Sequence, residues 1–206
     1  MKRLKDIPPA FNLYDKIGVM DFAIFENAGG TEQEIVAAIP QTLRHARTFD
    51  EARLRALGCR PIDRRAFFGD WYDLESGTLL KAGSYRTADG SVLHNPKLTR
   101  LDGVEIMSGA TPIPEAGAGG QFAYAFSNSV FGFEGKPSEF QSFFEEIRDF
   151  ILPEGERSEI LDWASPNLPD VSDYFTDGME WWGVFLFSIH VPKLRQLTII
   201  AGSTTD

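Results

Sequence analysis

Apolar residues recur every three or four positions between residues 138 and 151, and this spacing predicts an amphipathic helix. Ser138 is the expected N-cap, and Gln141, three residues later, completes a capping box. Acidic residues occupy the opposite side of the helix, where solvent is expected. The apolar stripe consists of Phe140, Phe143, Phe144, Ile147, Phe150 and Ile151.

Two shorter helices are predicted nearer the N-terminus. Thr31 and Glu34 form a capping box ahead of an apolar pattern that runs to Leu43. Pro40 lies inside that pattern, so a kink or two short helices is expected there. A second helix begins at the cap Asp50 and ends at Gly58.

Other segments have the length and composition of strands. Residues 121–134 and 181–191 are apolar on both faces, which is typical of strands covered on both sides. Residues 197–203 are expected to return as the antiparallel neighbour of 181–191. Asp89-Gly90 indicates a hairpin turn. The remaining strand candidates are 14–25, 67–73, 79–86, 91–95 and 98–108.

Short connections between most strands favour the α+β class, with a largely antiparallel sheet and helices packed mainly on one face. The 206 residues are sufficient for one domain with a substantial core. The loop 110–120 is a weak internal boundary, so we expect a single α+β domain over residues 1–206.

Composition indicates a folded protein, with 43% hydrophobic residues and 17 Phe. The basic N-terminus lacks a following apolar segment, so no secretory signal is expected. No stretch approaches the roughly 18 apolar residues of a membrane helix. A single cysteine, Cys59, excludes an internal disulfide and favours a cytoplasmic location.

Charge is divided unevenly along the chain, whose formal net charge is −10. Residues 44–65 hold seven arginines against three acids, whereas 134–180 hold thirteen acids against three bases. The acidic excess disfavours nucleic acid and favours a basic protein partner. Two plainer interpretations remain: a solvated surface, or internal pairing of the arginines with the acidic region.

Motifs for catalysis and for metal binding are missing. No G-x-S-x-G occurs, and the three histidines lack metal-ligand spacing. The glycines 117–120 are not followed by a phosphate-binding helix pattern. Glu180 and His190 lie at opposite ends of the predicted strand 181–191, on the order of 30 Å apart, and cannot form one acid–base pair. No metal and no cofactor is therefore expected.

The leading hypothesis is a non-enzymatic, acidic protein-binding module, such as a bacterial immunity or antitoxin-type inhibitor that neutralises a basic toxin by direct binding. Aromatic anchors beside carboxylates are typical of such contacts. The predicted contact residues are Glu145, Glu146, Asp149, Asp170, Asp173, Tyr174, Asp177, Glu180 and Trp181.

The alternative hypothesis is a small-molecule-binding protein or hydrolase with an aromatic and carboxylate-lined cleft. A carboxylate beside aromatic rings can have a raised pKa and act as a general acid, or bind a sugar or a cation. The predicted cleft residues are Asp70, Trp71, Tyr72, Asp73 and Trp182.

Overall fold

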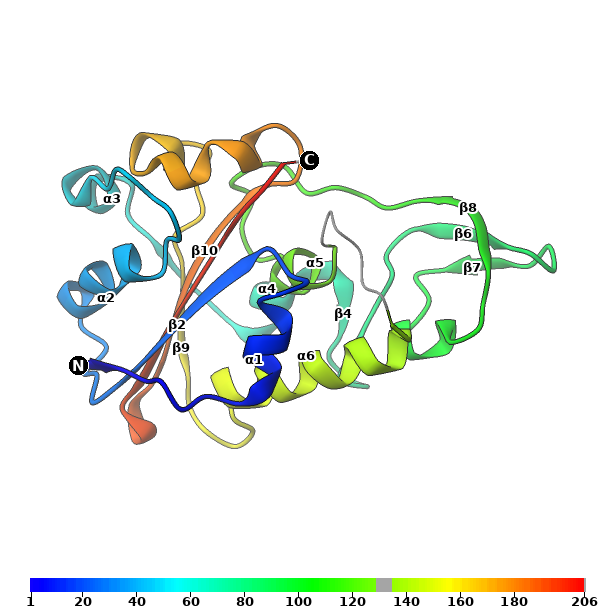
Figure 1. The fold of residues 1–206 in the computed structure, drawn as a ribbon, viewed down its shortest axis with the longest axis horizontal. Helices are drawn as coiled ribbons and strands as arrows, with labels where there is room; N and C mark the ends of the chain where they lie inside the picture. Colours follow the sequence, from blue (N-terminus) through cyan, green and yellow to red (C-terminus); the bar gives the residue numbers. More distant parts are fainter. Residues whose placement is uncertain (129–134, 206) are drawn as a thin grey trace.

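A six-stranded sheet runs through the centre of the molecule (Figure 1). The computed structural model describes residues 1–128 and 135–205. Every neighbouring pair in the order β1-β2-β11-β10-β9-β3 is antiparallel, which confirms the α+β class. The strands are β1 (Lys2–Arg3), β2 (Met20–Glu26), β3 (Arg60–Ile62), β9 (Glu159–Asp162), β10 (Val184–Val191) and β11 (Gln196–Ser203).

The hairpin β10–β11 occupies the middle of this sheet, as the sequence predicts. Phe187 lies opposite Ile200, and the strands are joined through a 3₁₀ turn that ends with Arg195 in the left-handed region at φ 50°. All eight residues of β10 are buried, because both faces of the strand are covered. The strand begins at Val184, three residues after the predicted start.

Helices cover both faces of the sheet, so the expectation that they pack mainly on one face is not confirmed (Figure 1). Side chains of β10 alternate between two cores, with Phe185 and Phe187 in one and Val184 and Leu186 in the other. The first core is covered by α1 (Pro9–Tyr14), α4 (Arg64–Phe68), α5 (Phe122–Ser127) and α6 (Pro137–Ile151). The second core is covered by α2 (Glu32–Ala38), η1 (Ile39–Gln41), α3 (Glu51–Leu57), η4 (Leu168–Asp170), η5 (Asp173–Phe175) and η6 (Asp177–Met179).

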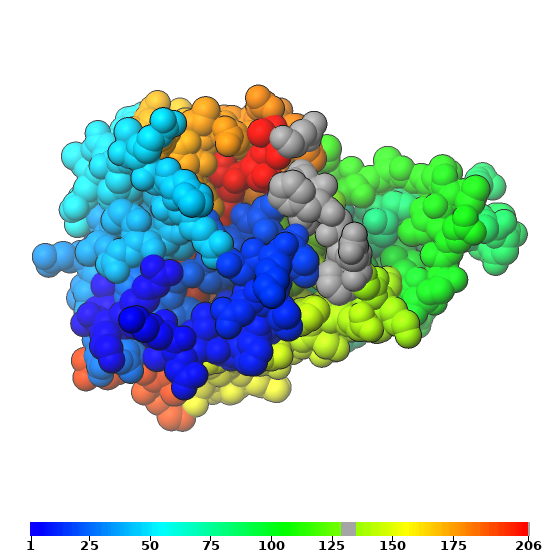
Figure 2. Space-filling view, in the orientation of Figure 1, coloured from blue at the N-terminus to red at the C-terminus, as the bar shows by residue number. Residues whose placement is uncertain are grey.

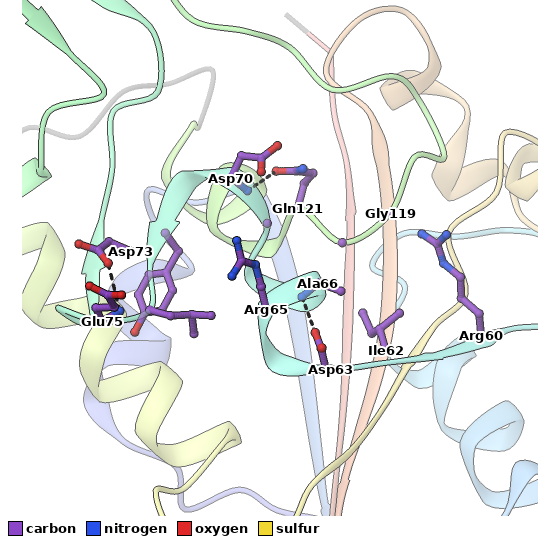
Figure 3. A pocket seen from close by; sticks show the side chains of 14 residues that line it. Arg60, Ile62, Asp63, Arg65, Ala66, Asp70, Asp73, Glu75, Gly119 and Gln121 are labelled. Atoms are coloured by element: carbon purple, nitrogen blue, oxygen red, sulfur yellow. Dashed lines mark hydrogen bonds between the residues drawn. The ribbon is translucent and has the colours of Figure 1, made fainter.

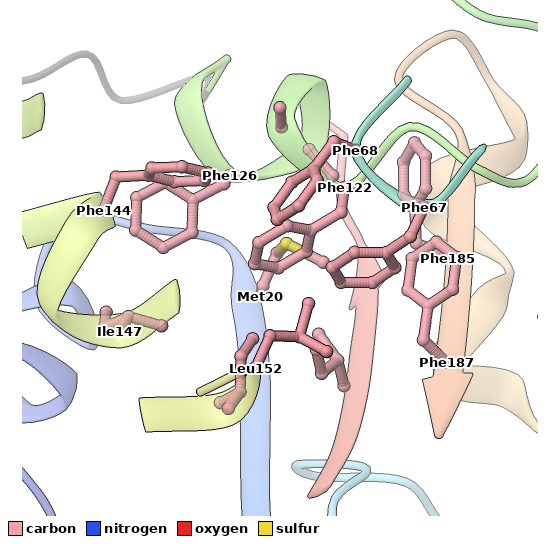
Figure 4. Close-up of a cluster of buried hydrophobic side chains, with 14 of the residues drawn as sticks. Met20, Phe67, Phe68, Phe122, Phe126, Phe144, Ile147, Leu152, Phe185 and Phe187 are labelled. Carbon is pink, nitrogen blue, oxygen red and sulfur yellow. The ribbon is translucent and has the colours of Figure 1, made fainter. Parts of the chain in front are cut away.

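The first core is rich in aromatic side chains (Figure 4). Phe67 stacks on Phe122 with ring centroids 4.6 Å apart, and its edge meets Phe187 at 5.1 Å. Full burial of one such side chain is worth about 1.5–3 kcal/mol. The core therefore fixes α4 and α5 on the sheet, and both elements border the candidate site.

Local capping follows the sequence for two helices and differs for a third. Thr31 Oγ1 accepts from the Glu34 amide, and Asp50 accepts from the Arg53 amide. The long helix α6, however, begins at Pro137 rather than after Ser138. At this start, the backbone amide of Lys136 donates a hydrogen bond to the Glu139 carboxylate at 3.2 Å. Proline at the first helical position has no N–H to satisfy, which favours this start.

Pro40 has the predicted effect. The α-helix ends at Ala38, and a 3₁₀ turn, Ile39–Gln41, carries the chain on. Ile35, Val36 and Ile39 are all buried against the second core.

Some of the predicted strands are wrong in whole or in part. The largest error is 121–134, where α5 occupies Phe122–Ser127 and 129–134 lie outside the described residues. A short, fully buried helix and a buried strand share a continuous apolar pattern, so periodicity cannot separate them. In three other segments, helical turns overlap the predicted strand: the last residue of α1 in 14–25, the end of α4 and η2 (Gly69–Trp71) in 67–73, and η3 (Leu98–Leu101) in 98–108. The predicted strand 79–86 is interrupted at residues 81–83, which belong to no strand.

A small three-stranded sheet, order β7-β6-β8, projects from the body, and Figure 2 shows it at the right. We call residues 78–113 the arm. Asp89-Gly90 turns between β6 and β7, as predicted. A separate two-stranded pair joins the arm to the body. The strands are β4 (Tyr72–Asp73), β5 (Thr78–Leu79), β6 (Ser84–Thr87), β7 (Val92–His94) and β8 (Ile106–Ala110).

No helix within residues 1–128 and 135–205 has both the length and the apolar character needed to cross a membrane.

Candidate functional site

A groove with a volume of about 760 Å³ lies where α4, η2 and β4 meet the glycine-rich loop at 119–121 (Figure 3). Carboxylates and arginines line it together with the ring of Tyr72. A volume of this size falls within the range of ligand pockets, about 300–1,000 Å³. We call this cavity the groove.

Local sequence explains the shape of its floor. Asp63 caps α4 by accepting from the Ala66 amide at 2.7 Å, and Gly69 ends that helix at φ 71°. A Cβ on Gly69 would lie 2.4 Å from the carbonyl oxygen of Gly120. The two glycines therefore allow the 119–121 loop to close against the end of α4.

An ion pair holds the opposite end of the groove. The guanidinium of Arg60 on β3 contacts the buried carboxylate of Asp162 on β9 at 2.7 Å, and it also donates to the Ala118 carbonyl. Gly119 packs directly on this pair, since a Cβ there would lie 2.1 Å from Asp162 Oδ2. The positive charge of Arg60 is thus paired with a carboxylate of the same chain.

The groove carboxylates differ in their surroundings. Asp73 accepts from the Ser76 hydroxyl at 2.6 Å and pairs with Lys97 at 3.0 Å, and these contacts hold its pKa far below the ordinary value. Asp70 and Glu75 are exposed, and no cationic side chain within residues 1–128 and 135–205 pairs with either carboxylate. The groove therefore offers three negative charges that the described cations leave unpaired, those of Asp63, Asp70 and Glu75, and Asp63 also accepts from the Ala66 amide. The guanidinium of Arg65 lines the same groove.

Tyr72 connects the groove to the polar face of α6. Its hydroxyl accepts from Arg148 at 2.9 Å, and burial raises its pKa, so the phenol stays neutral. Arg148 also pairs with Asp149, while Glu145 accepts from Gln141 on the same side of α6. Three of the sequence-predicted contact residues, Glu145, Glu146 and Asp149, thus lie on a helix that borders the groove.

The predicted cleft residues divide into two sets. Asp70, Tyr72 and Asp73 line the groove, whereas Trp71 and Trp182 are 5% and 0% exposed and pack in the first core. The ring of Tyr124 contacts both tryptophans, with centroids at 5.1 Å and 6.1 Å. Neither indole lines the groove.

The acidic residues near 170 are engaged by arginines of the 44–65 region. Asp173 accepts from the Arg47 amide at 2.9 Å, and backbone and side-chain bonds from Arg47 and Thr48 lower its pKa to about 2. Asp170 pairs with Arg53 at 2.6 Å. The internal pairing considered from the sequence is therefore present, and it neutralises part of the predicted contact surface.

Tyr174 belongs to a third network rather than to an exposed contact. Its hydroxyl donates to Asp21 Oδ2 at 2.9 Å, and Arg44 approaches the other oxygen of Asp21 at 2.6 Å. Burial raises the pKa of Asp21 and, well beyond the ordinary range, that of Tyr174. This network closes one side of the second core.

The remaining predicted contact residues lie at the start of the central hairpin. Glu180 accepts from the Thr205 hydroxyl at 2.6 Å, Asp177 is exposed, and Trp181 is 37% exposed. His190, at the far end of β10, instead meets Glu159 of β9 at 3.4 Å. Glu180 and His190 therefore have different partners, in line with the separation inferred from the strand length.

The structure adds groove residues that sequence reasoning did not single out, namely Arg65, Glu75, Gly119 and Gln121. In the sequence, Asp63 as an N-cap and Gly69 six residues later predict a short helix. This pattern could have indicated the part of the groove formed by α4. The glycines 117–120 are considered only as a phosphate-binding loop, and nothing in the sequence connects Gly119 or Gln121 with this groove, because they reach it only through tertiary packing.

Among the residues that the structure describes, no three His, Cys, Asp or Glu side chains gather into a cluster able to hold a metal ion. A scan against protein-family models finds no match for this sequence, and searches of the curated proteins and of the solved structures find none either. The fold and the groove thus define an antiparallel α+β protein with an acidic groove beside a long acidic helix.

Proposed function

We propose that this chain is a non-enzymatic binding protein that inhibits a basic partner by direct contact, in the manner of an immunity or antitoxin protein of the bacterial cytoplasm. The observation that carries the proposal is the pair of exposed carboxylates Asp70 and Glu75, which lack a cationic partner among the described side chains. Asp170 and Asp173, by contrast, are each paired with an arginine. Free carboxylates in a concave site favour a partner that supplies Lys or Arg.

The polar face of α6 extends this acidic surface. Glu146 is exposed, and Asp149 keeps an exposed carboxylate despite its contact with Arg148. We expect a partner segment in the groove to meet Asp149 beside the Arg148–Tyr72 contact. We therefore place the contact on the groove and α6, and not on the 170–181 region, where Asp170 and Asp173 are paired with arginines.

A small-molecule ligand is the second candidate, and the volume of the groove favours it. The hydrolase form of this candidate has less support. The lowered pKa of Asp73 keeps its carboxylate ionised at neutral pH, so Asp73 cannot act as a general acid.

Co-purification tests the proposal. The wild-type chain, used as bait in its native host, should retain one basic protein in stoichiometric amount, and the complex should weaken as salt rises. A double variant, D70N/E75Q, should lose that protein. Recovery of no stoichiometric basic protein, or of one bound equally at all salt concentrations, would refute the proposal.

A further inference from the structure

A second cavity, with a volume of about 780 Å³, lies on the arm. Thr87 and Leu93 of the small sheet line it, together with Pro96 and Val104. The Asp73–Lys97 ion pair separates this cavity from the groove, because Asp73 lines only the groove and Lys97 only the arm cavity. The two cavities are thus different sites.

Apolar surface is concentrated on the arm. Val92, Val104 and Met107 are 49%, 37% and 62% exposed, and of these three Val104 lines the cavity. A sheet of three short strands needs an apolar face covered by other side chains to be stable. The cavity leaves Leu93 on that face partly uncovered, and Val104, which precedes β8, is exposed beside it.

The charge of the arm is opposite to that of the rest of the chain. Residues 78–113 carry four Lys and Arg against three Asp and Glu, whereas the whole chain has a net charge of −10. Arg100 lines the cavity, is exposed, and has no carboxylate partner within the described ranges. Two carboxylates line the same cavity: that of Asp89 accepts from the Thr87 hydroxyl and the Ser91 amide, and that of Glu105 is exposed.

The outer strand of the small sheet adjoins the same cavity, and no described strand pairs with its outer edge. β7 is the outer strand of the order β7-β6-β8, and its residues Leu93 and His94 line the cavity. An edge strand presents unpaired backbone N–H and C=O groups that can pair with another extended chain. Peptides that add a strand in this way place alternate side chains in neighbouring pockets.

We propose that the arm cavity binds the free C-terminus of a peptide whose last side chain is apolar. The peptide pairs with the edge of β7, its last side chain packs on Leu93 and Val104, and its carboxylate meets Arg100. Each requirement of the ligand corresponds to one feature of the site: backbone edge, apolar lining, unpaired guanidinium.

Fluorescence anisotropy tests this with labelled Gly/Ser hexapeptides that end in Leu or Phe and carry a free carboxylate. Matched peptides carry a C-terminal amide, or end in Asp. We expect the free-acid apolar peptides to bind the wild-type chain, and the amides and Asp-ended peptides to bind at least about tenfold more weakly.

Two arginine variants complete the test. R100Q should weaken binding of the free-acid peptides by about tenfold, because it removes the cation that meets the carboxylate. R86Q is the matched control, since Arg86 is exposed on the other face of the same sheet and does not line the cavity. Filling the cavity with V104W should abolish binding while far-UV circular dichroism stays unchanged. Absence of wild-type binding, equal binding of acid and amide, or equal effects of R100Q and R86Q would overturn the proposal.

Discussion

Arg47 and Asp173 lie in contact although 126 positions separate them in the chain. The guanidinium Nε of Arg47 is 3.1 Å from one carboxylate oxygen of Asp173, and the Arg47 amide donates to the other at 2.9 Å. Thr48 adds an amide and a hydroxyl to the same oxygen. This contact ties the chain before α3 to the 3₁₀ turn η5, and it explains why an arginine-rich and an acid-rich segment coexist in one protein.

Replacing Asp173 should therefore destabilise the fold. We predict that D173A lowers the midpoint of urea unfolding at pH 7, because four donors lose their acceptor. D177A is the matched control, since Asp177 is exposed one turn later and its carboxylate makes no ion pair with a described residue. An equal effect of the two variants would contradict this role for Asp173.

The same pair predicts a pH dependence. The pKa of Asp173 is about 2 in the folded chain, below its ordinary value of 3.8. A carboxyl group with a depressed folded pKa stabilises the fold above its unfolded pKa, and the stabilisation is lost as pH falls. The difference between wild type and D173A should thus be constant above about pH 5 and shrink between about pH 4 and 2. Urea unfolding across this range measures it, and a difference that stays constant down to pH 2 would be inconsistent with the ion pair.

Close packing at Gly119 gives a second prediction. Its φ of +68° costs an alanine about 1–2 kcal/mol, and a Cβ would also meet Asp162 at 2.1 Å. G119A should therefore lose more stability than the conformational cost alone. G90A measures the conformational cost alone, because Gly90 also has positive φ but a Cβ added there would meet nothing within 4 Å. Equal losses in chemical unfolding would show that the groove loop does not pack on the Arg60–Asp162 pair.

The sequence predicts those elements whose caps and apolar spacing lie within one short segment. Thr31 with Glu34, Asp50 with Gly58, and the Phe140–Ile151 stripe are local, and each predicted element exists. The run at 122–126 is buried on every side, so its apolar pattern carries no period and predicts a strand where a helix forms.

The candidate site is only partly predictable for a related reason. Asp70, Tyr72 and Asp73 are recognisable from their own residue types, whereas the groove exists because the 119–121 loop crosses α4 about 50 residues later. Conversely, the acids near 170 look free in the sequence. Arginines more than 100 positions away pair with them, and no local pattern reveals such contacts.

Cys59 should be a poor nucleophile. Burial raises the pKa of its thiol, and the carboxylates of Glu32 and Asp162 raise it further. Since the thiolate is the reactive form, alkylation by iodoacetamide should be slower at pH 7.5 in the folded chain than in the urea-unfolded chain, and its pH profile should be displaced upward. A faster reaction in the folded state would instead indicate an activated thiol.

The groove carboxylates are the centre of the proposed function, and two variants of equal charge test them. D70N/E75Q removes the groove charges of Asp70 and Glu75, whereas D6N/E154Q removes two exposed carboxylates outside the groove. Both variants change the net charge by the same amount, so any difference between them reports position rather than overall charge.

The most direct measurement is isothermal titration calorimetry of the co-purified basic protein with the wild-type chain and these two variants. We predict that D70N/E75Q raises Kd by at least about tenfold, which corresponds to about 1.4 kcal/mol, while D6N/E154Q changes Kd by less than about twofold. Equal Kd values for the two variants would contradict binding through the groove.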